Sequence, residues 1–106
     1  MKVRVVYNSK IPGLLGAEGV TLYPFIFFRD SKPVPGYLLL HEMIHIRQYR
    51  AGGIGFVVDY IWEWFKGIFK YWNFDKAYRK NPYEQEAYRG QFSGSLTNEE
   101  KAELWD

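Results

Sequence analysis

Two histidines and a glutamate are the residues of this chain with the clearest capacity for chemistry. Residues 41–45 have the sequence HEMIH, an HExxH motif, within Tyr37–Arg50, a segment without glycine or proline that is predicted to be helical. Residues four apart on a helix share one face, so the imidazoles of His41 and His45 can bind one metal ion. Zinc held in this way acidifies a bound water, and Glu42 can take its proton as the water attacks a carbonyl group.

A third metal ligand has to come from elsewhere in the chain, because catalytic zinc usually has three protein ligands and an open position for water. No histidine follows His45 and the chain has no cysteine, so a carboxylate is expected. Asp59 and Glu63 share a polar stripe with lysines of their own helix, which a solvent-exposed face explains. Asp75 falls in a predicted connector, which leaves Glu84 and Glu86.

Glu84 is the preferred third ligand. Glu84 and Glu86 are about 200° apart around a helix, so only one of them can face a given site. Glu84 shares its face with Ala87 and Tyr88, which are expected to pack inward. An alternative stays open, because Glu84 stands three residues after Asn81, a predicted helix N-cap, where a capping-box glutamate would lie. One carboxylate cannot serve both roles.

The composition excludes several other classes of protein. The chain has 106 residues, no cysteine and a formal net charge of +2 from 14 Lys+Arg and 12 Asp+Glu. Without cysteine there is no disulfide scaffold, thiolate metal site or cysteine nucleophile, and the near balance of charge predicts no nucleic-acid partner. The first 15 residues carry Lys2, Arg4 and Lys10 and no continuous apolar stretch, so no secretory signal is predicted and a cytoplasmic location is expected.

The elements expected to position the motif form an α+β fold in one domain, residues 1–106. A small N-terminal antiparallel β-hairpin or sheet should be followed by three to four helices, with the HExxH helix central. Lys2–Tyr7 and Val20–Arg29 are predicted strands, rich in β-branched and aromatic residues. Pro24 cannot donate to a sheet, so the second strand is either an edge strand that could bind an extended peptide or a core strand with one aromatic face.

Helix boundaries are indicated by glycine and by capping residues. Residues 51–53 (AGG) should end the HExxH helix, and Ile54–Trp72 should form a second helix. Asn81, followed by proline, begins a third helix that runs to about Phe92, and Thr97 begins a short final helix with capping-box spacing.

The second predicted helix, Ile54–Trp72, is apolar around most of its circumference. A core helix with one exposed polar stripe is the preferred interpretation. A peripheral contact with a membrane surface and a dimer or protein-partner surface are the alternatives. The longest stretch without charge, Gly19–Phe28, is far shorter than the ~20 residues of a transmembrane helix, so no such helix is expected.

An HExxH helix followed by a glutamate in an E-x-E-A context resembles the gluzincin-type zinc metallopeptidases. The segments HEMIHIRQ and NPYEQEAYR also resemble small bacterial and phage proteins built around HExxH. This resemblance implies a minimal zincin-like domain, zinc bound by His41, His45 and Glu84, Glu42 as general base, and a peptide or protein substrate. In those families an Asp four residues after the ligand glutamate often supports a zinc histidine; here that position is Tyr88, so its hydroxyl or another group takes this role.

The resulting prediction is a zinc-dependent metallopeptidase. The alternative is a non-catalytic zinc-binding module, or a protein- or membrane-interaction module, that retains the HExxH site. Gln48, one turn after His45, either supports the site or is a surface amide. A stabiliser of the oxyanion is also expected, and the sequence does not rank the candidates Tyr78, Tyr83, Tyr88 and Arg47. Metzincins need a further histidine and deformylases a cysteine ligand, and neither is present.

Overall fold

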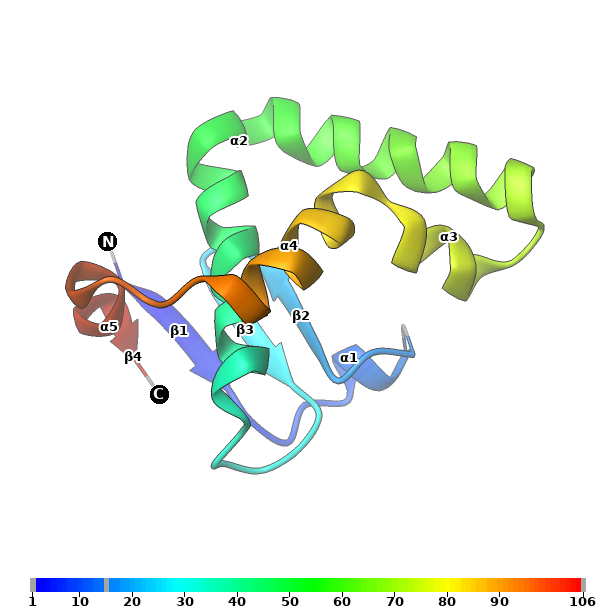
Figure 1. Ribbon diagram of the computed structural model, residues 1–106. Coiled ribbons are helices and arrows are strands. Elements are labelled where there is room, and N and C mark those ends of the chain that lie inside the picture. The colour runs from blue at the N-terminus through cyan, green and yellow to red at the C-terminus, as the bar shows by residue number, and fades with distance from the viewer. Residues whose placement is uncertain (1, 15, 106) are drawn as a thin grey trace.

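A computed structural model describes residues 2–14 and 16–105, which form a small sheet and a group of helices (Figure 1). The predicted α+β class is confirmed. The strands are β1 (Val3–Val6), β2 (Gly19–Leu22), β3 (Phe25–Phe28) and β4 (Leu104–Trp105). The helices are α1 (Ile11–Leu14), α2 (Gly36–Tyr71), α3 (Phe74–Lys80), α4 (Pro82–Ser93) and α5 (Asn98–Glu103).

The sheet is mixed rather than antiparallel throughout. Its strand order is β2-β3-β1-β4. β2 and β3 form an antiparallel hairpin, whereas β1 runs parallel to both of its neighbours, β3 and β4. The chain leaves β1 through α1 and enters the hairpin at its outer strand, so β3 returns beside β1 in the same direction. The C-terminal β4 completes the other edge (Figure 1).

The prediction of one strand over Val20–Arg29 is wrong, because two strands and a tight turn occupy this segment. Tyr23 and Pro24 form the turn, and Leu22 pairs with Phe25 across it. Proline has a fixed φ and no N–H to donate, which suits a turn and not a strand interior. Of these two strands, β2 therefore lies at an edge of the sheet and β3 lies inside it.

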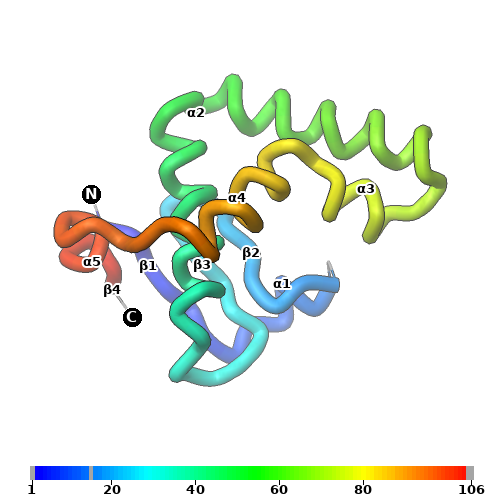
Figure 2. Tube along the Cα trace, in the orientation of Figure 1, coloured from blue at the N-terminus to red at the C-terminus, as the bar shows by residue number. Residues whose placement is uncertain are grey.

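Helix α2 consists of two arms that meet at Gly53. This residue has φ 57° and ψ −138°, a conformation that glycine adopts without a steric penalty and other residues do not. The chain turns sharply there, as the tube in Figure 2 shows. The predicted break between two helices thus lies at Gly53. We call residues 36–52 the first arm and residues 54–71 the second arm.

The first arm lies between the sheet and α4, so the HExxH helix is central, as predicted. Alternate residues of β1 and β3 are buried against it, and the cluster consists of Val3, Val5, Ile26, Phe28, Met43 and Ile46. On its other side Leu40 and Ile44 pack against Ala87 of α4. Both packing faces fix the position of the histidines, which lie on the same turns.

Helix α3 occupies the segment that the sequence analysis left as a connector. Asn73 caps it by accepting a hydrogen bond from the Lys76 N–H. It packs against the second arm where Gly67 faces Ala77, and a Cβ at Gly67 would lie only 3.0 Å from the Ala77 Cβ. The predicted starts of the last two helices are confirmed, including the capping box of Thr97.

The second arm is more exposed than the preferred core interpretation predicted. Phe56 is its only fully buried hydrophobic residue among those described. Its predicted polar stripe is present, and Glu63 of this stripe pairs with Lys66. A second, apolar face is exposed as well. Among residues 2–14 and 16–105, no helix combines the length and the hydropathy needed to cross a bilayer.

Candidate metal centre

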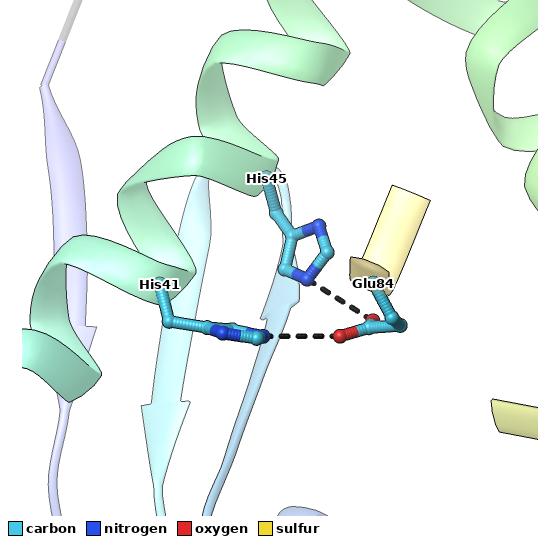
Figure 3. A group of neighbouring side chains, drawn as sticks. All are labelled: His41, His45 and Glu84. Carbon is cyan, nitrogen blue, oxygen red and sulfur yellow. Dashed lines mark hydrogen bonds and ion pairs between the residues drawn. The ribbon is translucent and has the colours of Figure 1, made fainter. Parts of the chain in front are cut away.

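The three predicted metal ligands come together at the junction of the first arm and α4 (Figure 3). His41 Nε2 lies 3.0 Å from Glu84 Oε1, and His45 Nε2 lies 3.0 Å from Glu84 Oε2. All three side chains are buried, and one ligand atom from each lies within 4.8 Å of the others. Two residues of one helix and one of another, 39 positions later in the chain, thus share one site.

Glu84 faces the histidines and does not cap its helix. The Asn81 side chain caps α4 by accepting from the Tyr83 N–H. Glu84 Oε2 instead accepts a hydrogen bond of 2.7 Å from the Tyr60 hydroxyl of the second arm. The backbone N–H of Asn81, to which a capping glutamate would bind, donates to the Tyr78 carbonyl, so Glu84 is not a cap and lies beside the histidines.

The other candidate carboxylates lie away from the histidines. Glu86 is exposed and accepts from Gln48 Nε2 at 2.8 Å. Asp59 accepts from the Tyr83 hydroxyl. Each of the remaining two carboxylates pairs with a base on its own helix, Glu63 with Lys66 and Asp75 with Arg79.

A glutamine supports each histidine from behind. Gln91 Oε1 lies 2.5 Å from His41 Nδ1, and Gln48 Oε1 lies 2.7 Å from His45 Nδ1. The Gln48 amide is oriented because its Nε2 donates to the Tyr83 carbonyl at 3.1 Å. A carboxamide oxygen only accepts, so each Nδ1 carries a proton and each Nε2 is the atom directed at Glu84.

Support of the histidine ligands was expected from the Tyr88 hydroxyl or from another group, and the two glutamines are the groups that contact the histidine Nδ1 atoms. The Tyr88 ring packs edge-on against His41, with 4.7 Å between ring centroids. Of the two glutamines, Gln48 is a candidate for this role from the sequence, whereas Gln91 is found only in the structure. Gln91 follows Glu84 by seven residues, two helical turns, so helical periodicity would have placed it on the same face.

Charge in the centre is balanced by the histidine–glutamate pair. Burial alone would lower the pKa of His45, but the Glu84 carboxylate beside it raises that pKa to about 9. Burial alone would raise the pKa of Glu84, but His41 and His45 lower it to about 2. The metal-free centre therefore holds a buried ion pair at neutral pH.

The donor set fits a zinc ion. Two imidazole nitrogens and one carboxylate form a common catalytic zinc site. The N···O separations of 3.0 Å resemble the roughly 3.3 Å between two ligand atoms on a tetrahedral zinc with bonds of about 2.0 Å. His45 Nε2 is also fully buried without a well-directed hydrogen bond, despite its short distance to Glu84. An ion would supply the missing partner of this nitrogen.

Glu42 lies beside the centre, against the edge strand β2. Its Oε1 accepts a hydrogen bond of 2.8 Å from the Thr21 hydroxyl. Its Oε2 approaches the backbone of Gly19, where a Cβ would be only 3.1 Å from it. Burial raises the pKa of Glu42, and the two histidines act in the opposite direction. The base predicted from the motif thus has one oxygen held in place and a raised proton affinity.

A cleft of about 330 Å³ opens onto this side of the centre. His41 and Glu42 form part of its wall, and residues 16–19 form another part. Helices α3 and α4 complete it with Asp75, Tyr78, Arg79, Tyr88 and Gln91.

Two of the four candidates for oxyanion stabilisation lie in this cleft. Tyr78 and Tyr88 line it. Arg47 pairs with Glu100 at 2.7 Å, and the Tyr83 hydroxyl donates to Asp59, so both are engaged elsewhere. Burial raises the pKa of Tyr78 and Tyr88, which keeps both hydroxyls protonated as hydrogen-bond donors.

Comparison of the chain with protein-family models, with curated proteins and with solved structures finds no match. What the centre can do follows from its own residues and distances.

Proposed function

We propose that this chain is a zinc-dependent metallopeptidase, with His41, His45 and Glu84 as metal ligands and Glu42 as general base. The observation that carries the proposal is the convergence of both histidine Nε2 atoms on Glu84, with each Nδ1 supported by a glutamine. Zinc bound by these residues would polarise a peptide carbonyl and lower the pKa of a water molecule.

Glu42 is suited to take a proton from the attacking water. The Thr21 hydroxyl fixes one carboxylate oxygen, so the side chain keeps its orientation towards the cleft that His41 shares. A raised pKa brings a carboxylate closer to the operating pH, which improves a general base. The same carboxyl can then return the proton to the leaving amine.

An extended peptide is the substrate that the surroundings of Glu42 favour. β2 is an outer strand of the sheet, and only β3 pairs with it among the described strands. Its free edge offers backbone groups to a peptide by strand addition. The loop residues 16–18 and Gly19, the first residue of β2, line the cleft beside Glu42. Tyr88 and Tyr78 lie in the same cleft, where a hydroxyl can donate to the developing oxyanion.

The test combines metal content with hydrolysis of a peptide library. We expect about one zinc per chain, and Glu42→Gln should retain the zinc and lose hydrolysis by roughly 10²–10⁴-fold. His45→Ala should lose the metal. Glu99→Gln, an exposed carboxylate on α5, is the control and should change neither.

Two outcomes would reject this function. Wild-type protein that binds no zinc would remove the centre itself. Stoichiometric zinc without turnover on any peptide would instead support the alternative, a non-catalytic zinc-binding module.

A further inference from the structure

The second arm of α2 carries a continuous apolar face that points away from the rest of the molecule. Its members recur every three or four residues and are all exposed: Ile54, Val58, Ile61, Trp62, Phe65, Phe69 and Trp72. We call this set the aromatic face. The opposite side of the arm packs on α3 and α4 through Phe56, Tyr60 and Gly67. Figure 1 shows the second arm at the outside of the molecule, with α3 and α4 on one side of it.

Large exposed aromatic rings concentrate at the far end of this face, where α2 ends and α3 begins. Phe69 and Phe74 are each 68% exposed, and Trp72 is 80% exposed. The surfaces of soluble proteins rarely carry such a contiguous apolar patch unless it is a binding site for a protein, a ligand or a membrane.

Trp72 adds a conformational argument. It ends α2 with φ 52° and ψ 37°, the left-handed conformation in which helices usually place glycine. A tryptophan there bears a steric penalty that glycine avoids, and its ring gains little burial in return. A residue that is both strained and exposed indicates a role outside the packing of the chain.

Two lysines lie over the ring of Tyr71 at this end of the arm, beside Trp72 in the chain. The ammonium groups of Lys70 and Lys76 lie 5.3 and 4.8 Å from the centroid of the Tyr71 ring. The two acidic residues of the arm lie nearer its start and are already engaged, Glu63 with Lys66 and Asp59 with the Tyr83 hydroxyl. Asp75, at the start of α3, pairs with Arg79, so Lys70 and Lys76 leave the far end with apolar rings and a net positive charge.

We propose that the aromatic face and its lysines bind the surface of a bilayer that contains anionic lipids. Aromatic rings with flanking lysines are typical of segments that lie in the membrane interface, and the lysines complement anionic headgroups. A second copy of this chain fits less well, since its own carboxylates on this arm are already engaged. The second arm lies on the far side of α3 and α4 from the sheet (Figure 1). No residue of the aromatic face lines the cleft, so the face can bind while the cleft stays open.

The test is co-sedimentation of the full chain with vesicles of phosphatidylcholine, with and without phosphatidylglycerol. We expect binding that requires phosphatidylglycerol and weakens with salt. One lysine near an anionic surface contributes about fivefold in affinity, so Lys70→Gln with Lys76→Gln should weaken binding about 25-fold. Trp72→Gly should abolish most binding while its melting temperature stays equal or rises, because glycine suits this conformation. Phe92→Ser, which removes a ring that is 78% exposed on α4, is the matched control and should bind as wild type does.

Three results would overturn this proposal. The first is a wild-type protein that does not bind vesicles containing phosphatidylglycerol, and the second is a Trp72→Gly variant that binds them unchanged. The third is a dimer in sedimentation equilibrium that Trp72→Gly dissociates, which would assign the face to a second copy. The experiment is run with a chelator and again with zinc. Because lipid binding does not use the metal centre, its result stands whatever the hydrolysis assay shows.

Discussion

Removal of the two supporting glutamines should weaken zinc binding to different extents. Gln91→Ala and Gln48→Ala each leave a histidine Nδ1–H without its carboxamide acceptor. An unsatisfied buried donor costs about 1–3 kcal/mol, and loss of a group that supports a metal ligand typically lowers affinity about 10–100-fold. The two ranges agree, since a tenfold change in affinity is about 1.4 kcal/mol.

The surroundings of each glutamine determine how large its loss of zinc affinity should be, within the range of about 10–100-fold. Gln91 is partly exposed and lines the cleft, so a water molecule can replace its oxygen, and we expect a loss of about tenfold. Gln48 is buried, and its Nε2 also donates to the Tyr83 carbonyl and to Glu86. Its removal leaves polar groups on both α2 and α4 without a hydrogen-bond partner, so we expect about 100-fold weaker zinc binding and a lower free energy of unfolding.

Substitution by glutamate should separate the two positions further. A carboxylate at Gln91 still accepts from His41 Nδ1 and makes the imidazole a stronger donor to the metal, so Gln91→Glu should bind zinc at least as tightly as wild type. Gln48→Glu should bind more weakly than wild type, because an oxygen would replace the Nε2 that lies 2.8 Å from Glu86 Oε1.

The assay is competition for zinc with a chromogenic chelator near neutral pH, with circular dichroism as the check on folding. Gln85→Ala is the control, since Gln85 lies on α4 but donates to the Arg79 carbonyl. If both alanine variants bind zinc as wild type does, the glutamines do not orient the histidines. A Gln91→Glu variant weaker than Gln91→Ala would refute the assigned proton positions.

Three further predictions concern charge and packing. Folding raises the pKa of His45 to about 9 and lowers that of Glu84 to about 2. The stabilisation from these groups is therefore complete only between pH 4.5 and 6.5. Thermal melts with a chelator should show stability falling towards pH 9, as His45 loses its proton, and towards pH 2, as Glu84 gains one. Bound zinc should reverse the decline at alkaline pH. Gly67→Ala should destabilise the fold by about 1–3 kcal/mol in urea, because its Cβ would lie 3.0 Å from a side chain of α3, whereas Gly55→Ala meets nothing within 4 Å and should not. Tyr60→Phe removes the 2.7 Å hydrogen bond to Glu84, and zinc affinity measured by competition should fall several-fold.

Helical periodicity was enough to predict which three side chains lie together in the candidate metal centre. The HExxH spacing places His41 and His45 on one face, and the inward face of the later helix selects Glu84 over Glu86. The sequence favoured the ligand role of Glu84 but left the capping role open, because both roles suit the same position. The backbone N–H of Asn81, to which a capping-box glutamate would bind, donates instead to the Tyr78 carbonyl, so Glu84 remains available to the histidines.

The sheet was harder to predict because its order depends on contacts between distant parts of the chain. A run of apolar residues from Val20 to Arg29 gives the same pattern for one long strand as for two short strands and a turn. Pro24 lies in the turn between β2 and β3, but proline occurs both in edge strands and in turns, so its presence did not distinguish the two. The parallel pairing of β1 with β3 follows from the route of the chain through α1, which local sequence does not encode.

Four ionisable side chains are buried together in the centre, those of His41, Glu42, His45 and Glu84, and the two carboxylates need protons or a cation to compensate their charge. Without metal, a proton on His45 balances Glu84, and burial favours the protonated form of Glu42. With a divalent cation bound between neutral imidazoles, the ionised forms of Glu42 and Glu84 balance its two positive charges. Burial disfavours two ionised carboxylates side by side without a cation, whereas a bound divalent cation compensates both of them. Metal binding therefore favours the ionised form of Glu42, so the charge state that makes Glu42 a base is linked to the ion that would activate the water.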